Sequence, residues 1–353
     1  MTTAPSTGSA APSTSSAAPS AGSAAPSAGS ASSPFVATYL VLSHRRGDKV
    51  RALADRILEL SPNGHVVVHH DSTGADPPWE GAPPSRVHTI DPVAVKWGGW
   101  SIVEASLRLV RFAADELAAD WFVFLSGDDR PIVDLARWED RVREDAIDGI
   151  VEATRITKRP VLGRRPTRED LNYARYMYRW RAVPAVRNAA GQTAVEFTRR
   201  ISRWAQPLFK IERTPRREEW MLGFPRRSRS LPGGLALYIG PQWVSFGRRA
   251  AKALLDADPA LVDWYRETWI PDQSFFQTVL YNEPSLTMRN APVTFVPKQG
   301  IRPGPGGWML LRTGDLEDLR QSGCAFARKF DAEIEPEILR VVDEAIDASR
   351  ERA

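Results

Sequence analysis

Short runs of large apolar residues, each ended by polar residues, recur along the early part of the chain. The runs lie at 37–43, 65–71 and 121–125, and each is too short for a helix of its own. Such runs are typical of strands that are buried on both faces. Between the first two runs, the apolar residues follow the spacing of one helical stripe, with Asp48 as the expected N-cap; the stripe is Val50, Leu53, Ala54, Ile57 and Leu58. A strand, a helix and a strand in this order predict a βαβ unit and a parallel sheet.

A second helix is predicted to start at Ser101 and to lead into the strand at Trp121. Ser101 and Glu104 have the spacing of a capping box, and the apolar residues that follow define a buried stripe. That stripe is Ile102, Ala105, Leu109 and Ala113. The expected fold class is therefore α/β, a Rossmann-type, mostly parallel sheet flanked by helices.

Polar side chains follow each of the three predicted strands. The strands end at Ser43-His44, at Asp71 and at Asp128-Asp129. In a right-handed parallel arrangement these ends face one edge of the sheet, where open α/β sheets bind ligands. Asp128 and Asp129 are equally compatible with a turn or a helix cap. The dinucleotide-binding glycine signature and the Walker phosphate loop are both missing from the sequence.

The rest of the chain divides by composition. Residues 1–34 are Ala, Pro, Ser, Gly and Thr with no charge, which predicts a disordered tail. Residues 35–353 are expected to form a single domain. Within it, the Arg-rich stretch 154–230 is expected to be a largely helical insertion with a helix at 168–181, and 332–353 is expected to hold a C-terminal helix.

Charge and cysteine content narrow the classes of partner and the compartment. The formal charge of +4 is too small for a dedicated nucleic-acid binder, so no nucleic-acid partner is expected. A single cysteine excludes an intrachain disulfide and favours a reducing compartment. No apolar run is long enough to cross a membrane, and no secretory signal is visible. We expect a cytoplasmic protein. This expectation allows peripheral contact between the basic insertion and the inner face of the membrane.

Four separated groups of residues agree on one family. They are Val68-His-His-Asp71; Lys96-Trp-Gly-Gly-Trp-Ser101 with Phe124-Leu-Ser-Gly-Asp-Asp-Arg-Pro131; Gly240-Pro-Gln-Trp-Val-Ser245 with Ile270-Pro-Asp-Gln-Ser-Phe-Phe-Gln-Thr278; and Phe326-Ala-Arg-Lys-Phe-Asp331. Their order and spacing resemble the core-2/I-branching enzymes of glycosyltransferase family 14. That family includes the branching β-1,6-N-acetylglucosaminyltransferases and the protein O-xylosyltransferases, and the chain resembles a bacterial-type member.

The resemblance implies a GT-A-like fold that takes a UDP-sugar and inverts its anomeric centre without a metal or other cofactor. The implied donors are UDP-GlcNAc and UDP-xylose, and the implied acceptor is a glycan or another hydroxyl compound. Uridine would be held at the strand ends, and the basic pair near the C-terminus would hold the diphosphate, with Lys329 as the best match. The implied donor-binding residues are Ser43, His44, Asp71, Asp128, Asp129, Arg328 and Lys329. An upstream arginine partner is also implied, and both Arg302 and Arg312 fit loosely.

The catalytic base is the point at which the chain departs from the family. Where the family carries a glutamate, this chain has Gln273, and an amide cannot take a proton at neutral pH. The adjacent Asp272 can serve as the base, another acid from the insertion can, or the protein is impaired as a transferase. Both residues are expected at a helix N-terminus, which would hold the Asp272 carboxylate ionised.

The sequence gives weaker evidence for the roles of several other residues. Trp243 is a candidate for the acceptor side. The Asp-x-Asp at Asp256 and Asp258 is expected to be structural, since it falls at a helix end. His69 and His70 point to opposite faces of a strand and cannot chelate one metal ion together. The alternative function is a catalytically impaired sugar- or nucleotide-binding protein, because of Gln273, and a nucleic-acid binder is a third hypothesis.

Overall fold

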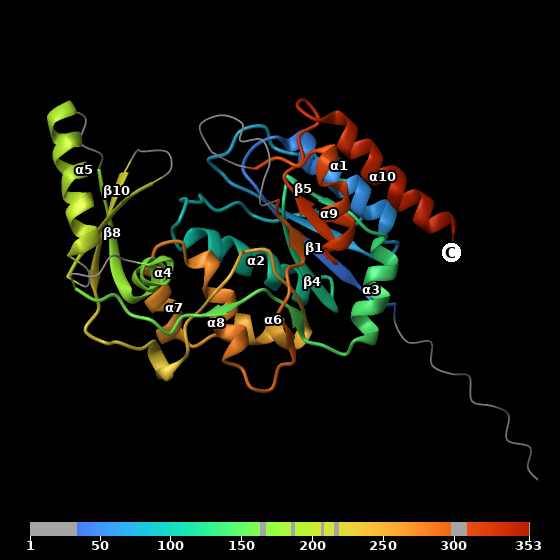
Figure 1. Cartoon of the computed structure of the whole chain (residues 1–353). Coiled ribbons are helices and arrows are strands. Elements are labelled where there is room, and N and C mark those ends of the chain that lie inside the picture. Colours follow the sequence, from blue (N-terminus) through green and yellow to red (C-terminus); the bar gives the residue numbers. More distant parts are fainter. Residues whose placement is uncertain are drawn as a thin grey trace, which may run out of the picture. The chain divides into compact units, whose positions relative to one another are not determined.

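The centre of the fold is a seven-stranded sheet in which four parallel strands lie side by side (Figure 1). The computed structural model describes residues 34–162, 167–184, 188–205, 208–214, 219–297 and 309–352. In the order of the sheet, its strands are β13 (Met288–Arg289), β6 (Gly149–Ile150), β12 (Ser245–Gly247), β4 (Trp121–Ser126), β1 (Ala37–Ser43), β2 (His65–His70) and β3 (Val87–Thr89). β12 runs antiparallel to both β4 and β6. The predicted βαβ unit and mostly parallel sheet are confirmed.

Helices cover both faces of this sheet. One face is covered by α2 (Ser101–Asp115), α6 (Arg248–Leu255) and α8 (Phe275–Tyr281). The other is covered by α1 (Gly47–Leu60), α3 (Leu135–Glu144) and α10 (Pro336–Glu351). Along β4, Phe122 and Phe124 enter the first layer, whereas Trp121, Val123 and Leu125 enter the second. This alternation explains why the strand is continuously apolar: both of its faces are core.

Two smaller sheets bring distant segments to the central one. β14 (Thr294–Phe295), β15 (Phe326–Arg328) and β5 (Asp129–Pro131) form one, and β11 (Tyr238–Ile239) pairs with β7 (Thr154–Arg155) in the other. β15 is antiparallel to β5, with Arg328 opposite Asp129. This pairing carries the C-terminal basic residues to the end of β4. The remaining short helices are η1 (Pro232–Gly234), α7 (Pro259–Arg266), η2 (Pro271–Gln273), η3 (Thr313–Asp315) and α9 (Leu316–Gln321).

The basic insertion is a mixed helix-and-strand unit rather than a largely helical one. It contains α4 (Arg168–Met177), β8 (Tyr178–Pro184), α5 (Ala189–Trp204), β9 (Lys210–Arg213) and β10 (Glu219–Pro225). The strands form an antiparallel sheet in the order β8-β10-β9. The expected helix at 168–181 therefore ends at Met177. Tyr178 and Trp180 point inward and Arg179 and Arg181 outward, a period of two that the dense arginines obscured in the sequence.

Three local predictions need correction. α1 begins at Gly47 rather than after an Asp48 cap, because Arg46 adopts the left-handed conformation at its N-terminus (φ 55°, ψ 57°). The capping box at Ser101 is not formed: the hydroxyl oxygen of Ser101 accepts instead from the backbone N–H of Lys96 at 2.8 Å. The apolar residues of 234–246 also predict a strand with a turn at Gly240-Pro241, but the strand structure is confined to β11 and β12.

Residues Phe35–Ala353 form one compact unit. The tail predicted for residues 1–34 falls outside the described residues apart from Pro34. Within the described part of the chain, no helix has both the length and the apolar character needed to cross a bilayer.

Candidate active site

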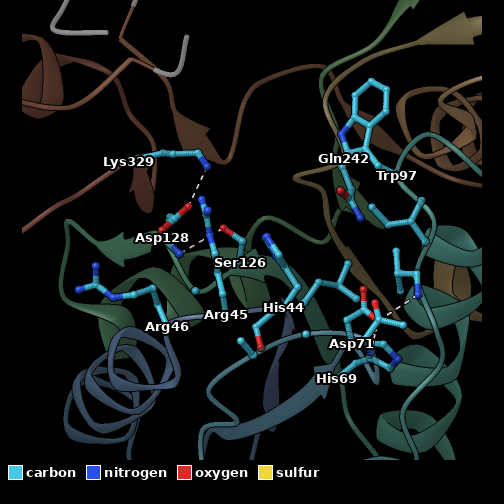
Figure 2. Close-up of a pocket in the computed structure, with 18 of the residues that line it drawn as sticks. His44, Arg45, Arg46, His69, Asp71, Trp97, Ser126, Asp128, Gln242 and Lys329 are labelled. Atoms are coloured by element: carbon cyan, nitrogen blue, oxygen red, sulfur yellow. Dashed lines mark hydrogen bonds and ion pairs between the residues drawn. The ribbon is translucent and has the colours of Figure 1, made fainter. Parts of the chain in front are cut away.

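A cavity of about 460 Å³ opens at the carboxyl ends of β1, β2 and β4 (Figure 2). Ser43 and His44 reach it after β1, Asp71 after β2, and Asp128 after β4. Arg328 and Lys329 also line it. The cavity is therefore lined by six of the seven residues that were predicted to bind the donor. The sheet brings the strand ends together, and the β15–β5 pairing adds the cations.

Asp71 organises the loop after β2. One of its carboxylate oxygens accepts from the backbone N–H and the hydroxyl of Thr73, both at 2.9 Å, and from the backbone N–H of Val95 at 3.1 Å. Burial opposes ionisation, but these hydrogen bonds outweigh it and lower the pKa of Asp71. Nearby, the hydroxyl of Ser43 lies 2.7 Å from Nδ1 of His70. The floor of the cavity is therefore tied together by side chains from both strands.

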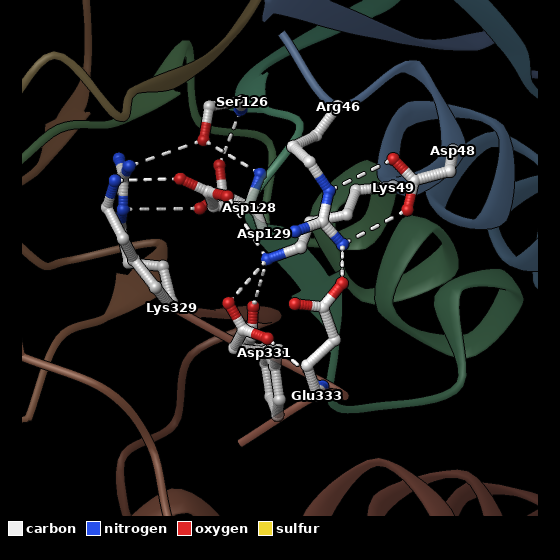
Figure 3. Close-up of polar contacts among 11 residues, drawn as sticks. Arg46, Asp48, Lys49, Ser126, Asp128, Asp129, Lys329, Asp331 and Glu333 are labelled. Atoms are coloured by element: carbon white, nitrogen blue, oxygen red, sulfur yellow. Dashed lines mark hydrogen bonds and ion pairs between the residues drawn. The ribbon is translucent and has the colours of Figure 1, made fainter. Parts of the chain in front are cut away.

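Asp128 and Lys329 form an ion pair at the rear of the cavity (Figure 3). Nζ of Lys329 donates to Oδ2 of Asp128 at 2.7 Å, and Nζ of Lys49 lies 3.7 Å from Oδ1. Burial opposes ionisation of Asp128, but the positive charges of Lys329, Lys49 and Arg328 prevail and lower its pKa. Burial lowers the pKa of Lys329, and Asp128 opposes that shift.

Arg328 is held from three sides. Its Nε lies 3.3 Å from Oδ1 of Asp129, one terminal nitrogen donates to the hydroxyl of Ser126 at 3.3 Å, and its guanidinium carbon lies 3.8 Å from the ring centre of Trp243. Asp129 is fully buried, so it positions Arg328 rather than lining the cavity. Burial raises the pKa of Asp129. The ring of Trp243 is a platform for Arg328 and lines the same cavity, and its role on the acceptor side stays a prediction.

Lys49 is a site residue that the sequence did not reveal. It lies in α1 and donates to the backbone oxygen of Phe330 at 3.1 Å and to Asp331 at 3.2 Å. Its partners are about 280 positions away in the chain, so no local pattern could indicate them. Arg45 and Arg46 also line the cavity. They directly follow Ser43-His44, and the strand-end argument that selected those two residues applies to them as well.

Asp272 and Gln273 lie beside the cavity wall and are not among its lining residues. The backbone oxygen of Gln273 accepts from Gly240 at 2.9 Å, two residues before the lining residue Gln242. The backbone N–H of Ile270 donates to Gly98 at 2.8 Å, next to the lining residue Trp97. Gln273 Oε1 lies 3.5 Å from a guanidinium nitrogen of Arg175.

The protonation of Asp272 differs from the expectation. Its side chain is 7% exposed, and burial raises its pKa to about 6, although its own backbone N–H and the charge of Arg175 oppose the shift. The predicted helix N-terminus is only the short η2, and α8 begins at Phe275. Desolvation therefore outweighs any stabilisation of the carboxylate by the helix N-terminus, and the carboxyl group titrates close to neutral pH.

The remaining candidates have structural partners. Asp258 caps α7 by accepting from the backbone N–H of Ala260 at 2.8 Å, and Asp256 pairs with Lys252. Nε2 of His69 accepts from the backbone N–H of Val93 at 2.8 Å, whereas His70 contacts Ser43. Arg312 is exposed and does not line the cavity. Arg302 lies outside the described residues.

Comparison with known proteins identifies the class. Residues 38–164, which contain β1, β2 and β4 with their polar ends, match the family described as Branch: Core-2/I-Branching enzyme. The match indicates a glycosyltransferase, a class that uses a nucleotide-sugar donor and a glycan acceptor. This part of the chain is therefore similar to the core-2/I-branching enzyme family, the family that the motifs predicted.

Other comparisons add no argument about function. No curated protein sequence matches the chain. Among solved structures, a Bacillus anthracis protein assigned as a glucose-1-phosphate thymidylyltransferase, in complex with sucrose, is 10% identical with a TM-score of 0.31, over 71% of this chain and 85% of that one. Mannose-1-phosphate geranyltransferase from Thermus thermophilus is 14% identical with a TM-score of 0.25, over 71% of this chain and 72% of that one.

Proposed function

We propose that the protein transfers a sugar from a UDP-sugar to an acceptor hydroxyl, with inversion and without a metal ion. The observation that carries the proposal is the cavity in which polar strand ends meet the buried Arg328 and the half-buried Lys329. The strand ends provide hydrogen-bonding groups for a nucleoside, and the cations suit a diphosphate. GlcNAc and xylose are the sugars that the family resemblance favours.

Departure of the diphosphate is the step that this cavity supports best. Negative charge develops on the leaving oxygen as the bond to the anomeric carbon breaks, and fixed cations stabilise that charge. Arg328 is held in place by Asp129, Ser126 and Trp243, so little reorganisation is needed when the charge appears. This arrangement supplies the role that a divalent cation plays in other transferases.

Asp272 is proposed as the group that takes the proton from the acceptor hydroxyl. A general base works best when its pKa lies near the operating pH, and burial gives Asp272 a pKa of about 6. Gln273 cannot act in this way, and its side chain contacts Arg175. Asp272 lies between Ile270 and Gln273, whose backbones bond to Gly98 and Gly240 next to cavity-lining residues, and it is not itself a lining residue.

The donor is tested with a panel of nucleotide sugars. We expect thermal denaturation to show that UDP-sugars raise the melting temperature more than the corresponding GDP-sugars, because a ligand that binds only the folded state stabilises it. With the best donor, slow release of UDP in the absence of acceptor is expected. Equal effects of all nucleotides, or none, would contradict the assignment of the cavity.

Lys329→Met should weaken both binding and turnover. Loss of a charge-assisted contact to the diphosphate should lower UDP affinity roughly 10- to 100-fold, and loss of charge stabilisation should lower turnover roughly 100- to 1,000-fold. Isothermal titration and a coupled UDP-release assay measure these effects. Lys252→Met is the matched control, since that lysine is exposed and pairs with Asp256 away from the cavity. Equal behaviour of the two variants would remove Lys329 from the donor site.

A catalytically impaired binding protein is the second candidate function. It is favoured by Gln273 at the position of the family's base and by the absence of Asp272 from the cavity lining. Tight UDP binding without UDP release from any donor, with or without glycan acceptors, would support this candidate over the transferase.

A further inference from the structure

Positive charge is concentrated in the basic insertion, residues 154–230. This stretch holds 20 of the 47 Lys and Arg residues but only 6 of the 43 Asp and Glu residues. It therefore carries a formal charge of +14, whereas the rest of the chain carries −10 within the overall +4. A charge separation of this size orients a protein toward an anionic surface over a range set by the Debye length.

Bulky apolar side chains are exposed in the same stretch. Of the ten large hydrophobic residues that are exposed in the described part of the chain, seven lie between 154 and 230. They are Val161, Leu162, Val183, Phe197, Ile201, Leu208 and Phe224. Single exposed apolar residues are ordinary, but their gathering in one small unit that is also basic is not.

The architecture turns these residues outward. The inner face of the β8-β10-β9 sheet carries Tyr178, Trp180 and Met221, which are buried in the main core. On β9, the backbone N–H of Ile211 donates to the hydroxyl of Ser202 in α5 at 3.2 Å. Figure 1 shows α5 at the outer side of this sheet, with α4 on the inner side.

Helix α5 combines the two features on its exposed surface. Phe197 is 64% exposed and Ile201 is 45% exposed, one helical turn apart. Arg200 and Arg203 are exposed beside them, and neither forms an ion pair with a described residue. A helix with apolar residues on a strip flanked by arginines is the pattern of a helix that lies in the interface of a bilayer.

We infer that the outer surface of the insertion, built on α5, docks the protein on a membrane that contains anionic lipids. Arginines attract the headgroups, while Phe197 and Ile201 enter the boundary between headgroups and acyl chains. A nucleic acid would satisfy the arginines but would leave the aliphatic side chain of Ile201 in water. The bilayer is therefore the occupant that accounts for both the charge and the exposed apolar residues.

Co-sedimentation of the full chain with vesicles tests this inference. Binding is expected to vesicles of phosphatidylcholine with phosphatidylglycerol and not to phosphatidylcholine alone, and to weaken as salt rises. Ile201→Ser should lower the partition coefficient about tenfold or more, because a buried apolar side chain is lost. Arg200→Gln with Arg203→Gln should lower it roughly 30-fold, at about 1 kcal/mol for each arginine.

Matched controls separate docking from general effects. Ile334→Ser changes an equally exposed isoleucine (46%) outside the insertion and should leave vesicle binding unchanged. Arg111→Gln is the corresponding control in α2, where Arg111 is exposed. Equal losses in Ile201→Ser and Ile334→Ser, no binding to anionic vesicles at low salt, or tighter binding to duplex DNA than to vesicles would each overturn the inference. Sugar transfer to a dissolved acceptor should be unaffected by Ile201→Ser, so this test is independent of the proposed function.

Discussion

Asp272→Asn is expected to abolish sugar transfer while leaving UDP affinity nearly unchanged. The amide keeps the size of the side chain but cannot accept the proton of the acceptor hydroxyl. The cavity that would hold UDP is lined by other residues, so donor binding should persist. We expect turnover to fall by at least about 1,000-fold, measured as product formation at saturating donor, with UDP affinity measured by titration.

The pH dependence of the wild-type turnover should show the titration of the same carboxyl group. A base with a pKa of about 6 is active when ionised, so turnover should be at its plateau above this pH and fall as the pH drops through 6. Asp263→Asn, at an exposed position of α7, is the control and should keep both activity and pH profile. Full activity of Asp272→Asn would reject Asp272 as the base and leave the role to another acid.

The same variant should stabilise the fold in alkaline solution. Burial raises the folded-state pKa of Asp272 to about 6, above its usual 3.8, so folding favours the protonated form. The wild-type protein therefore loses stability as the pH rises from about 4 through 6, and the loss is complete above 6. At pH 8, Asp272→Asn is expected to raise the free energy of unfolding by up to about 3 kcal/mol. Lower stability than the wild type at pH 8 would contradict the burial of a charge.

Gly240→Ala is expected to destabilise the protein by more than about 3 kcal/mol or to prevent folding. A Cβ atom at Gly240 would lie 2.0 Å from the backbone oxygen of Glu152, and a backbone atom cannot swing aside as a flexible side chain can. Gly240 also donates to the backbone of Gln273 and leads into the cavity residues Gln242 and Trp243. Urea unfolding measures the loss.

Gly81→Ala serves as the control for this substitution. A Cβ atom there would meet nothing within 4 Å, so a change of less than about 0.5 kcal/mol is expected. Unfolding of Gly240→Ala at the same urea concentration as Gly81→Ala would contradict the close contact between residue 240 and the backbone of Glu152.

The strand ends of the donor cavity were predictable because their signal is local. Each buried strand is a continuous apolar run, and parallel strands must end at one edge, so the amino-acid sequence alone places Ser43, Asp71 and Asp128 together. Lys329 needed the family resemblance, since an isolated basic residue carries no indication of its partner. Asp128, its partner at 2.7 Å, lies 201 positions away.

Tertiary context decided the features that were missed. The period of two in β8 is visible only once Tyr178 and Trp180 are known to face the core, because arginines surround them in the sequence. The pKa of Asp272 depends on how deeply η2 is buried, and a helix-end argument alone gave the opposite sign. The contact between Trp243 and Arg328 joins residues 85 positions apart, so no local pattern in the sequence predicts it.

The ion pair between Asp128 and Lys329 has a consequence for how strongly ionic strength affects donor affinity. A diphosphate that engages Lys329 exchanges one anionic partner for another, and Lys49, 3.7 Å from the carboxylate, stays to neutralise Asp128. Because one contact between opposite charges replaces another, much of the screening by dissolved ions cancels. UDP affinity should therefore change far less between dilute and concentrated buffer than the number of cations around the cavity suggests.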